Sequence, residues 1–268
     1  MGNRVPRLLP EYIKSLILDM DGVLWKEDTP IGNLPSIFDH IYARGLKVAF
    51  ATNNGSQTPD QYVERFTRFG VNVEPWQIVT SAQGVAALLS KKFPSGESIF
   101  AIGGAGVITA LHEKGFKLLS VETATRAQAV VIGIDTQINF EKMREAALLV
   151  RNGVPFYATN PDKTFPTPRG EIPGAGAWIS VIVTATGVEP IYAGKPAPFL
   201  LEMARERLGT EKSQTLVIGD RLETDIAGGQ ADECPVALVL SGVTRREQAQ
   251  MWRPIINIIV DDLAELVD

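Results

Sequence analysis

The amino-acid sequence predicts an α/β fold, a doubly wound parallel sheet that carries an inserted α/β domain. Two observations predict it. Short runs of Val, Ile, Leu and Ala recur along the 268 residues without polar alternation, which is typical of strands buried on both faces. Segments with helical periodicity separate these runs, and alternating β and α elements favour a parallel sheet covered by helices.

Seven apolar runs are expected to be strands. They cover residues 16–19, 47–53, 98–104, 129–135, 215–220, 236–240 and 256–260. Three of them end in a polar side chain, namely Asp19, Thr52 and Asp220. In open parallel sheets, ligands bind beyond the carboxyl ends of the strands, so we expect these three side chains to converge.

The composition excludes several classes of protein. With a formal net charge of -5 and no concentrated basic stretch, the chain lacks the electrostatic pattern of a nucleic-acid-binding protein. Cys234 is the only cysteine, which excludes an internal disulfide and fits a reducing compartment. No apolar segment is typical of a signal peptide or a membrane span, so we expect a cytoplasmic protein without membrane contact.

The first candidate for chemistry is DMDG, residues 19–22. Asp19 and Asp21 project to the same side of an extended segment, and Gly22 permits a sharp bend. The repulsion between the two carboxylates favours either one protonated acid beside an ionised nucleophile or a cation bound between them. Taken alone, the tetrapeptide is equally compatible with a surface turn.

Two polar loops are candidates for anion binding. Thr52 is followed by Asn53, Asn54 and a helix predicted to begin at Pro59, so its hydroxyl and nearby N–H groups are suited to an anion. Lys195 lies just before another predicted helix, where its ammonium group and the positive helix end both favour a phosphate. An ordinary connecting loop and a solvated lysine are the alternatives.

Two further acids lie in GDRLETD, residues 219–225. Asp220 directly follows a buried strand, where a carboxylate needs a partner or a cation. Asp225 falls at the start of the next predicted helix, where an acid also complements the helix dipole.

In this order, DMDGV, a strand-terminal Thr, a loop Lys and GDRLETD resemble the haloacid dehalogenase superfamily, and within it the NagD/4-nitrophenylphosphatase type. The resemblance covers essentially the whole chain. It implies a catalytic core formed by residues 1–81 and 190–268 and an α/β cap formed by residues 82–189. The chain between Thr52 and Lys195 is also far longer than one crossover requires.

The resemblance implies a Mg²⁺-dependent hydrolase of small phosphorylated metabolites. Asp19 would be the nucleophile that forms an aspartyl-phosphate, and Asp21 the general acid and base. Thr52 and Lys195 would bind the phosphoryl group, with Gly22, Asn53 and Asn54 beside them. Mg²⁺ would be held by Asp19, Asp220 and the backbone carbonyl of Asp21, with Asp225 orienting water ligands or Lys195.

The cap is expected to approach the leaving group through the Pro- and Gly-rich loop at residues 159–178. Asn160, Asp162 and the glycines at 174 and 176 are its candidate contacts, although a structural loop explains each of them equally well. Relatives of this type pair through the cap, so the resemblance also implies a homodimer.

Other functions stay open on the same residues. A phosphomutase would need a lid that shields the phosphorylated enzyme from water, and a non-catalytic sensor would be phosphorylated at Asp19 by a partner. A dehalogenase would need neither Asp21 nor a metal. A nicotinamide-dependent oxidoreductase is disfavoured, because the glycine cluster at residues 101–111 has Thr109 where G-x-G-x-x-G requires glycine.

Overall fold

The computed structural model describes residues 8–167 and 169–268, and they form two compact units. The first unit contains the described residues up to Thr52, together with Pro59–Val79 and Pro196–Asp268. The second contains Asn53–Thr58 and Thr80–Lys195. The segment expected as an insertion, residues 82–189, therefore falls within the second unit.

A six-stranded sheet organises the first unit, in the order β15-β14-β13-β1-β4-β5. Its strands are β1 (Ser15–Leu18), β4 (Lys47–Thr52), β5 (Ile78–Thr80), β13 (Thr215–Gly219), β14 (Val236–Val239) and β15 (Ile258–Val260). The pairs from β15 through to β4 are parallel. The chain builds outward from β1 on one side and from β13 on the other, so the topological switch point lies between these two strands.

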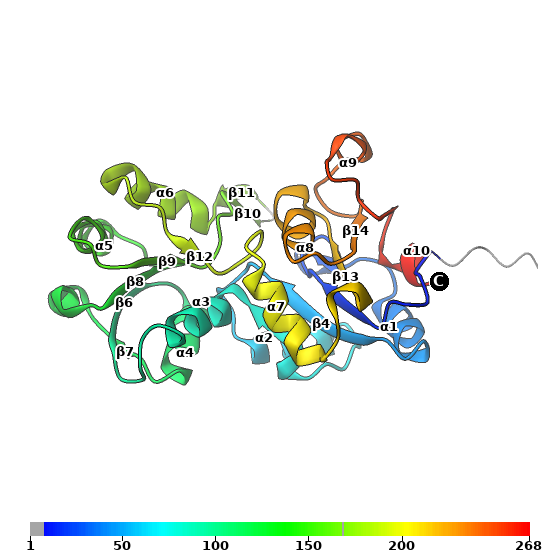
Figure 1. Cartoon of the computed structure of the whole chain (residues 1–268), viewed down its shortest axis with the longest axis horizontal. Helices are drawn as coiled ribbons and strands as arrows, with labels where there is room; N and C mark the ends of the chain where they lie inside the picture. The colour runs from blue at the N-terminus through cyan, green and yellow to red at the C-terminus, as the bar shows by residue number, and fades with distance from the viewer. Residues whose placement is uncertain (1–7, 168) are drawn as a thin grey trace, which may run out of the picture. The chain divides into compact units, whose positions relative to one another are not determined.

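Alternate side chains of the central strands pack on opposite faces of this sheet. Leu16 and Leu18 face one core cluster, which includes side chains from α1 (Leu34–Ala43), α2 (Pro59–Arg68) and α10 (Leu263–Val267). Ile17 faces the other, which includes α7 (Phe199–Leu208) and α9 (Arg246–Met251) (Figure 1). Helices on both faces of a mainly parallel sheet confirm the doubly wound architecture.

The second unit repeats this layered plan with five parallel strands in the order β12-β9-β8-β6-β7. The strands are β6 (Ser98–Ile102), β7 (Lys117–Leu118), β8 (Ala129–Ile132), β9 (Phe156–Ala158) and β12 (Ile191–Tyr192). One face packs on α3 (Ser81–Ser90) and α4 (Ala105–Glu113), the other on α5 (Phe140–Arg151) and α6 (Ala175–Thr186). The inserted α/β domain is therefore a second doubly wound sheet.

All seven predicted strands are present, but most end earlier than the apolar runs. The runs at 98–104 and 129–135 end as strands at Ile102 and Ile132, and the next residue in each case is a glycine, which weakens a strand. The three-residue strands β5 and β9 were not predicted, because they are too short for a periodic signal.

The loop expected at residues 159–178 is not irregular throughout. It contains an antiparallel hairpin of β10 (Thr164–Thr167) and β11 (Gly170–Pro173), and α6 begins at Ala175. The prolines in this segment favoured a loop, but Pro is tolerated on strands that lie at a sheet edge. A second small hairpin, β2 (Trp25–Lys26) with β3 (Thr29–Pro30), follows the DMDG segment in the first unit.

Within the described residues there are also four short helical turns: η1 (Pro75–Gln77), η2 (Val121–Arg126), η3 (Lys212–Gln214) and η4 (Leu222–Ile226), the last leading into α8 (Ala227–Ala231). Across the described residues, every helix is too short or too polar to cross a lipid bilayer.

Candidate active site

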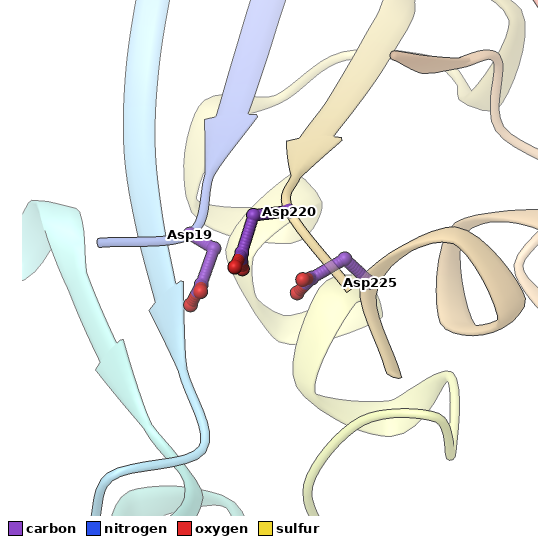
Figure 2. Close-up of side chains that lie close together, drawn as sticks. All are labelled: Asp19, Asp220 and Asp225. Atoms are coloured by element: carbon purple, nitrogen blue, oxygen red, sulfur yellow. The ribbon is translucent and has the colours of Figure 1, made fainter. Parts of the chain in front are cut away.

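Three carboxylates gather at the carboxyl edge of the first sheet, beside the switch point between β1 and β13 (Figure 2). Asp19 directly follows β1, and its N–H continues the sheet by donating to Ile218 O at 2.8 Å. Asp220 directly follows β13, and Asp225 lies in the π-helical turn η4. One oxygen from each carboxylate lies within 4.8 Å of the others, so the predicted convergence of Asp19 and Asp220 is present and Asp225 joins it.

The backbone holds two of these carboxylates in place. The Val243 N–H donates to Asp220 Oδ2 at 2.8 Å, and the Arg221 N–H donates to Asp225 Oδ2 at 3.0 Å. Both side chains are buried, with Asp220 2% and Asp225 1% exposed. The carboxylates of Asp220 and Asp225 are therefore held by main-chain donors in the loops after β13 and β14.

This donor set fits a divalent cation. Like charges about 4 Å apart repel by about 4 kcal/mol at an effective dielectric of about 20, so three clustered carboxylates call for a compensating charge. Carboxylate oxygens are the hard ligands that Mg²⁺ and Ca²⁺ prefer. The backbone also makes room for Asp220, because a Cβ built on Gly22 or Gly242 would lie 2.5 or 1.9 Å from its Oδ2.

Asp21 has a different environment from Asp19. Its Oδ1 accepts a hydrogen bond from Trp25 Nε1 at 2.9 Å. The chain turns sharply between Asp21 and Trp25. In this turn Gly22 has a φ of +85°, and its N–H donates to the Trp25 carbonyl at 2.8 Å. The main-chain donor of Gly22 is thus used inside the turn, which depends on the backbone conformation of this glycine.

Thr52 is the last residue of β4 and is 2% exposed. Its side chain shares a hydrogen bond with the hydroxyl of Tyr62 on α2. Burial is the main cause that raises the pKa of Tyr62, and the nearby charges of Asp21 and Asp19 raise it further. Tyr62 therefore stays a neutral hydrogen-bonding group beside these residues.

The remaining predicted residues lie in the second unit, where hydrogen bonds bring them together. The Asn53 side-chain amide donates to the carbonyl oxygen of Lys195 at 2.9 Å and to Asp162 Oδ1 at 3.3 Å. Asn160 Nδ2 donates to the Asn53 carbonyl at 2.7 Å, and its Oδ1 accepts from the Asp162 N–H at 3.1 Å. Lys195 itself is only 2% exposed, which excludes the ordinary solvated lysine considered from the sequence.

Asn54 and the two candidate glycines have local roles. Asn54 Oδ1 accepts from both the N–H and the hydroxyl of Ser56. A Cβ on Gly174 would lie 2.5 Å from the Asp162 carbonyl oxygen, and one on Gly176 would lie 2.2 Å from that of Pro161. The need for close backbone packing therefore explains both glycines without a substrate.

Known proteins resemble this chain in sequence over most of its length. A model of haloacid dehalogenase-like hydrolases matches residues 16–117, and a HAD-hydrolase-like model matches residues 192–266. The acid sugar phosphatase of Staphylococcus aureus is 36% identical over 237 residues, which cover 88% of this chain and 90% of that protein. The chain belongs to the haloacid dehalogenase-like hydrolases.

Solved structures of this family share the fold over nearly the whole chain. NagD from E. coli K-12 superimposes with a TM-score of 0.87 at 31% identity, covering 94% of this chain and 98% of NagD. A glycerol phosphate phosphatase from Mycobacterium tuberculosis, solved in complex with magnesium, gives 0.88 at 32% identity, covering 95% of this chain and 76% of that one. The similarity to NagD confirms the type expected from the motifs, and the protein is an enzyme of the HAD phosphatase class.

Sequence reasoning missed several residues that shape this HAD site. Trp25 is one, although it closes the run LILDMDGVLW in which the two acids were found. Tyr62 and the segment Ser241–Val243 are others, and the Ser241 hydroxyl donates to the Gly22 carbonyl at 2.7 Å. The predicted metal ligands were Asp19, Asp220 and the Asp21 carbonyl, whereas the carboxylates that cluster are those of Asp19, Asp220 and Asp225.

Proposed function

We propose that this enzyme is a Mg²⁺-dependent phosphomonoester hydrolase that acts on small phosphorylated metabolites through an aspartyl-phosphate on Asp19. The observation that carries the proposal is the carboxylate cluster at the switch point of the sheet, with Asp21 two residues beyond Asp19. The names of the similar proteins, an acid sugar phosphatase and a glycerol phosphate phosphatase, support phosphorylated sugars and polyols as the substrate class.

Each reacting group has one role in the proposed reaction. Asp19 attacks phosphorus, while Asp21 gives its proton to the leaving oxygen as the P–O bond breaks. Asp21 then takes a proton from water, which attacks the aspartyl-phosphate and releases inorganic phosphate. Thr52 and Lys195 bind the phosphoryl oxygens, since a neutral hydroxyl and an ammonium charge together orient and neutralise this group.

Asp19, Asp220 and the backbone carbonyl of Asp21 would hold Mg²⁺, and the Asp225 carboxylate adjoins them. When bound, Mg²⁺ offsets the repulsion between the nucleophile and the phosphate dianion. The clustered carboxylates support this assignment, because oxygen ligands from one or two acids plus phosphate suit Mg²⁺.

We further propose that residues 82–189 form the cap that selects the leaving group, with Asn160 and Asp162 on its substrate side. A segment with its own two-faced core is suited to closing over a reaction and excluding water. We place the activity in the cytoplasm, because the lone cysteine fits a reducing compartment.

A homodimer through the cap follows from the same proposal. Leu148 on α5, Val181 on α6 and Ile191 on β12 are about half exposed, although apolar side chains of this size are usually buried. Sedimentation velocity tests this: a dimer that Leu148→Glu converts to a monomer supports it, and a monomeric parent at micromolar concentration contradicts it.

The function is tested by hydrolysis of 4-nitrophenyl phosphate and a panel of sugar, glycerol and nucleoside phosphates, with Mg²⁺ or EDTA. Asp19→Asn should lower turnover by about 10³-fold or more, because it removes the nucleophile while keeping the side-chain volume. Asp39→Asn, on the exposed face of α1, is the matched control and should retain full activity.

Turnover that survives in Asp19→Asn would contradict the nucleophile assignment. Absence of turnover from a folded, Mg²⁺-supplied parent protein would favour the phosphomutase or the sensor. Stimulation by a sugar bisphosphate then identifies the mutase, and an aspartyl-phosphate that persists for minutes identifies the sensor.

A further inference from the structure

The Trp25 indole donates a hydrogen bond to the carboxylate of Asp21, the proposed general acid and base. The indole Nε1 lies 2.9 Å from Asp21 Oδ1, and the two residues also pair through an isolated β-bridge. They are four positions apart but lie in a turn rather than a helix, so their contact depends on the bend at Gly22 and on the β2–β3 hairpin.

The indole ring is held firmly. Trp25 is fully buried, and the edge-to-face contact with Phe66 places the ring centroids 5.0 Å apart. The guanidinium carbon of Arg65 lies over the face of the indole, 4.4 Å from the ring centroid. The ring centroid of Phe69 lies 5.7 Å from that of Trp25. Aromatic and cation–π contacts of this kind fix a ring in one orientation. A donor on this ring is therefore a fixed point for its acceptor.

An indole N–H can donate a hydrogen bond but cannot accept one. Asp21 Oδ1 therefore has the same acceptor role whether the carboxyl group is protonated or ionised. The proton that Asp21 gives and takes is confined to its other oxygen, Oδ2, and the plane of the carboxyl group does not need to change between the two half-reactions.

We infer that Trp25 is a positioning residue for proton transfer, which holds Asp21 Oδ1 so that Oδ2 carries the proton to the leaving group and accepts it back from water. This inference rests on the proposed hydrolase function. In the first half-reaction the Oδ2–H bond breaks, the proton joins the leaving oxygen, and the P–O bond to that oxygen breaks as Asp19 bonds to phosphorus. In the second, Oδ2 takes a proton from the water that adds to phosphorus, while the bond between phosphorus and the Asp19 oxygen breaks and the Asp19 carboxylate is restored.

The inference makes a prediction that depends on the leaving group. An alkoxide needs a proton as it leaves, whereas 4-nitrophenolate is a stable anion that needs little protonation. Positioned acid catalysis contributes about 10²–10⁴-fold where a proton is required, so losing its alignment should lower the rate chiefly for alkyl phosphates. The ratio kcat/KM reports this step, because it includes everything up to the first departure of a leaving group.

The experiment compares Trp25→Phe with the parent enzyme on 4-nitrophenyl phosphate and on glycerol phosphate or the alkyl phosphate that the parent turns over best. Phe keeps an aromatic ring but lacks the N–H donor. We expect kcat/KM for the alkyl phosphate to fall about 10-fold or more and that for 4-nitrophenyl phosphate to fall less than about 3-fold. Inhibition by inorganic phosphate should not change, since product binding involves no proton transfer to a leaving group.

Phe69→Leu is the matched control, because it removes a ring that packs on Trp25 and leaves the indole donor in place. It should affect both substrates equally. In an Asp21→Asn background, Trp25→Phe should have no further effect on the alkyl phosphate, because no proton is left to position.

An equal loss on both substrates in a folded Trp25→Phe protein would overturn the inference, and so would no loss on either substrate. A parent enzyme that hydrolyses neither substrate would instead overturn the proposed function. If Trp25→Phe does not fold, Trp25→Met, which also lacks the N–H donor and fills part of the same space with a flexible side chain, takes its place and must show the same selective loss for the inference to stand.

Discussion

The two sheets of this enzyme follow the same packing rules but differ in the chemistry at their carboxyl edges. Both are built from parallel strands with an apolar core cluster on each face. In the first unit, β1, β4 and β13 lead to Asp19, Thr52 and Asp220. In the second, β6 and β8 lead to glycines and β9 to Thr159. Strand interiors thus specify the layers, and a few residues just beyond the strands specify function.

Removing one buried carboxylate from each unit should separate the two edges most clearly. Asp220 lies in the acidic cluster, whereas Asp135 of the second unit is 7% exposed and forms an ion pair with Lys142 at 2.7 Å. Asp220→Asn should lower kcat by about 10²-fold or more and weaken the proposed activation by Mg²⁺, because it removes one charged group from the proposed metal site. Its melting temperature should not fall, since the change relieves repulsion among the acids.

Asp135→Asn should give the opposite result. It keeps activity but lowers the free energy of unfolding by about 1–3 kcal/mol, because it weakens a charge-assisted contact and leaves Lys142 without its counter-charge. Mg²⁺ titrations of activity and urea unfolding of both variants measure the contrast. Equal losses of activity in the two proteins would show that the edges do not differ as proposed.

A pair of glycines tests the same comparison through the backbone. Gly22 has a φ of +85°, and a Cβ there would lie 2.5 Å from Asp220 Oδ2, whereas a Cβ on Gly104, which follows β6, would meet no atom closer than 3.4 Å. Gly22→Ala should cost about 1–3 kcal/mol of stability and at least about 10-fold in kcat, because it strains the turn and displaces a carboxylate. Gly104→Ala should change stability by about 0.5 kcal/mol or less and leave kcat unaffected. Thermal melts and steady-state kinetics separate the two, and a Gly22→Ala enzyme with the activity of the parent would contradict this account of the site.

These contrasts also show what could be predicted from the sequence. Local patterns predict several elements. Apolar runs predict the buried strands before Asp19 and Asp220, and a first-turn proline predicts the helix that begins at Pro59. The parallel pairing of β1 with β13 brings the two acids together, and the alternation of β and α elements predicts such pairing.

Contacts that depend on irregular backbone could not be predicted. Asp225 was expected at an ordinary helix start, but the π-helical turn η4 directs its carboxylate toward the other two. The hydrogen bond between Trp25 and Asp21 depends on a turn and on a small hairpin. The two-residue strands of this hairpin carry no periodic signal. The hairpin within residues 159–178 was missed for a different reason, because its prolines suggest a loop.

The amino edge of the first sheet provides the last and smallest contrast. There Asp232 is paired with Arg205 at 3.3 Å and with Lys212 at 3.7 Å, so its charge is already balanced within the protein. Cys234, just before β14, donates to Asp232 from a buried position. Burial first, and the charge of Asp232 second, raise the pKa of its thiol to about 12. The acid at this edge is thus paired with basic side chains, whereas the acids at the carboxyl edge are those that we propose for the reaction.

A pKa raised in the folded state means that folding favours the protonated thiol. Its contribution to stability is complete below the ordinary pKa of 9.0 and is lost as the pH rises from there toward about 12. Over that range the free energy of unfolding should fall more steeply for the parent than for Cys234→Ser, by at most about 1.4 kcal/mol per pH unit. Serine keeps a donor to Asp232 but does not ionise in this range, and Tyr62 is common to both proteins, so the difference isolates the thiol. Urea unfolding at pH 8 and pH 10.5 measures it, and parallel curves for the two proteins would contradict the assignment. Turnover of 4-nitrophenyl phosphate at pH 7 should be the same in both, because this edge of the sheet takes no part in the reaction.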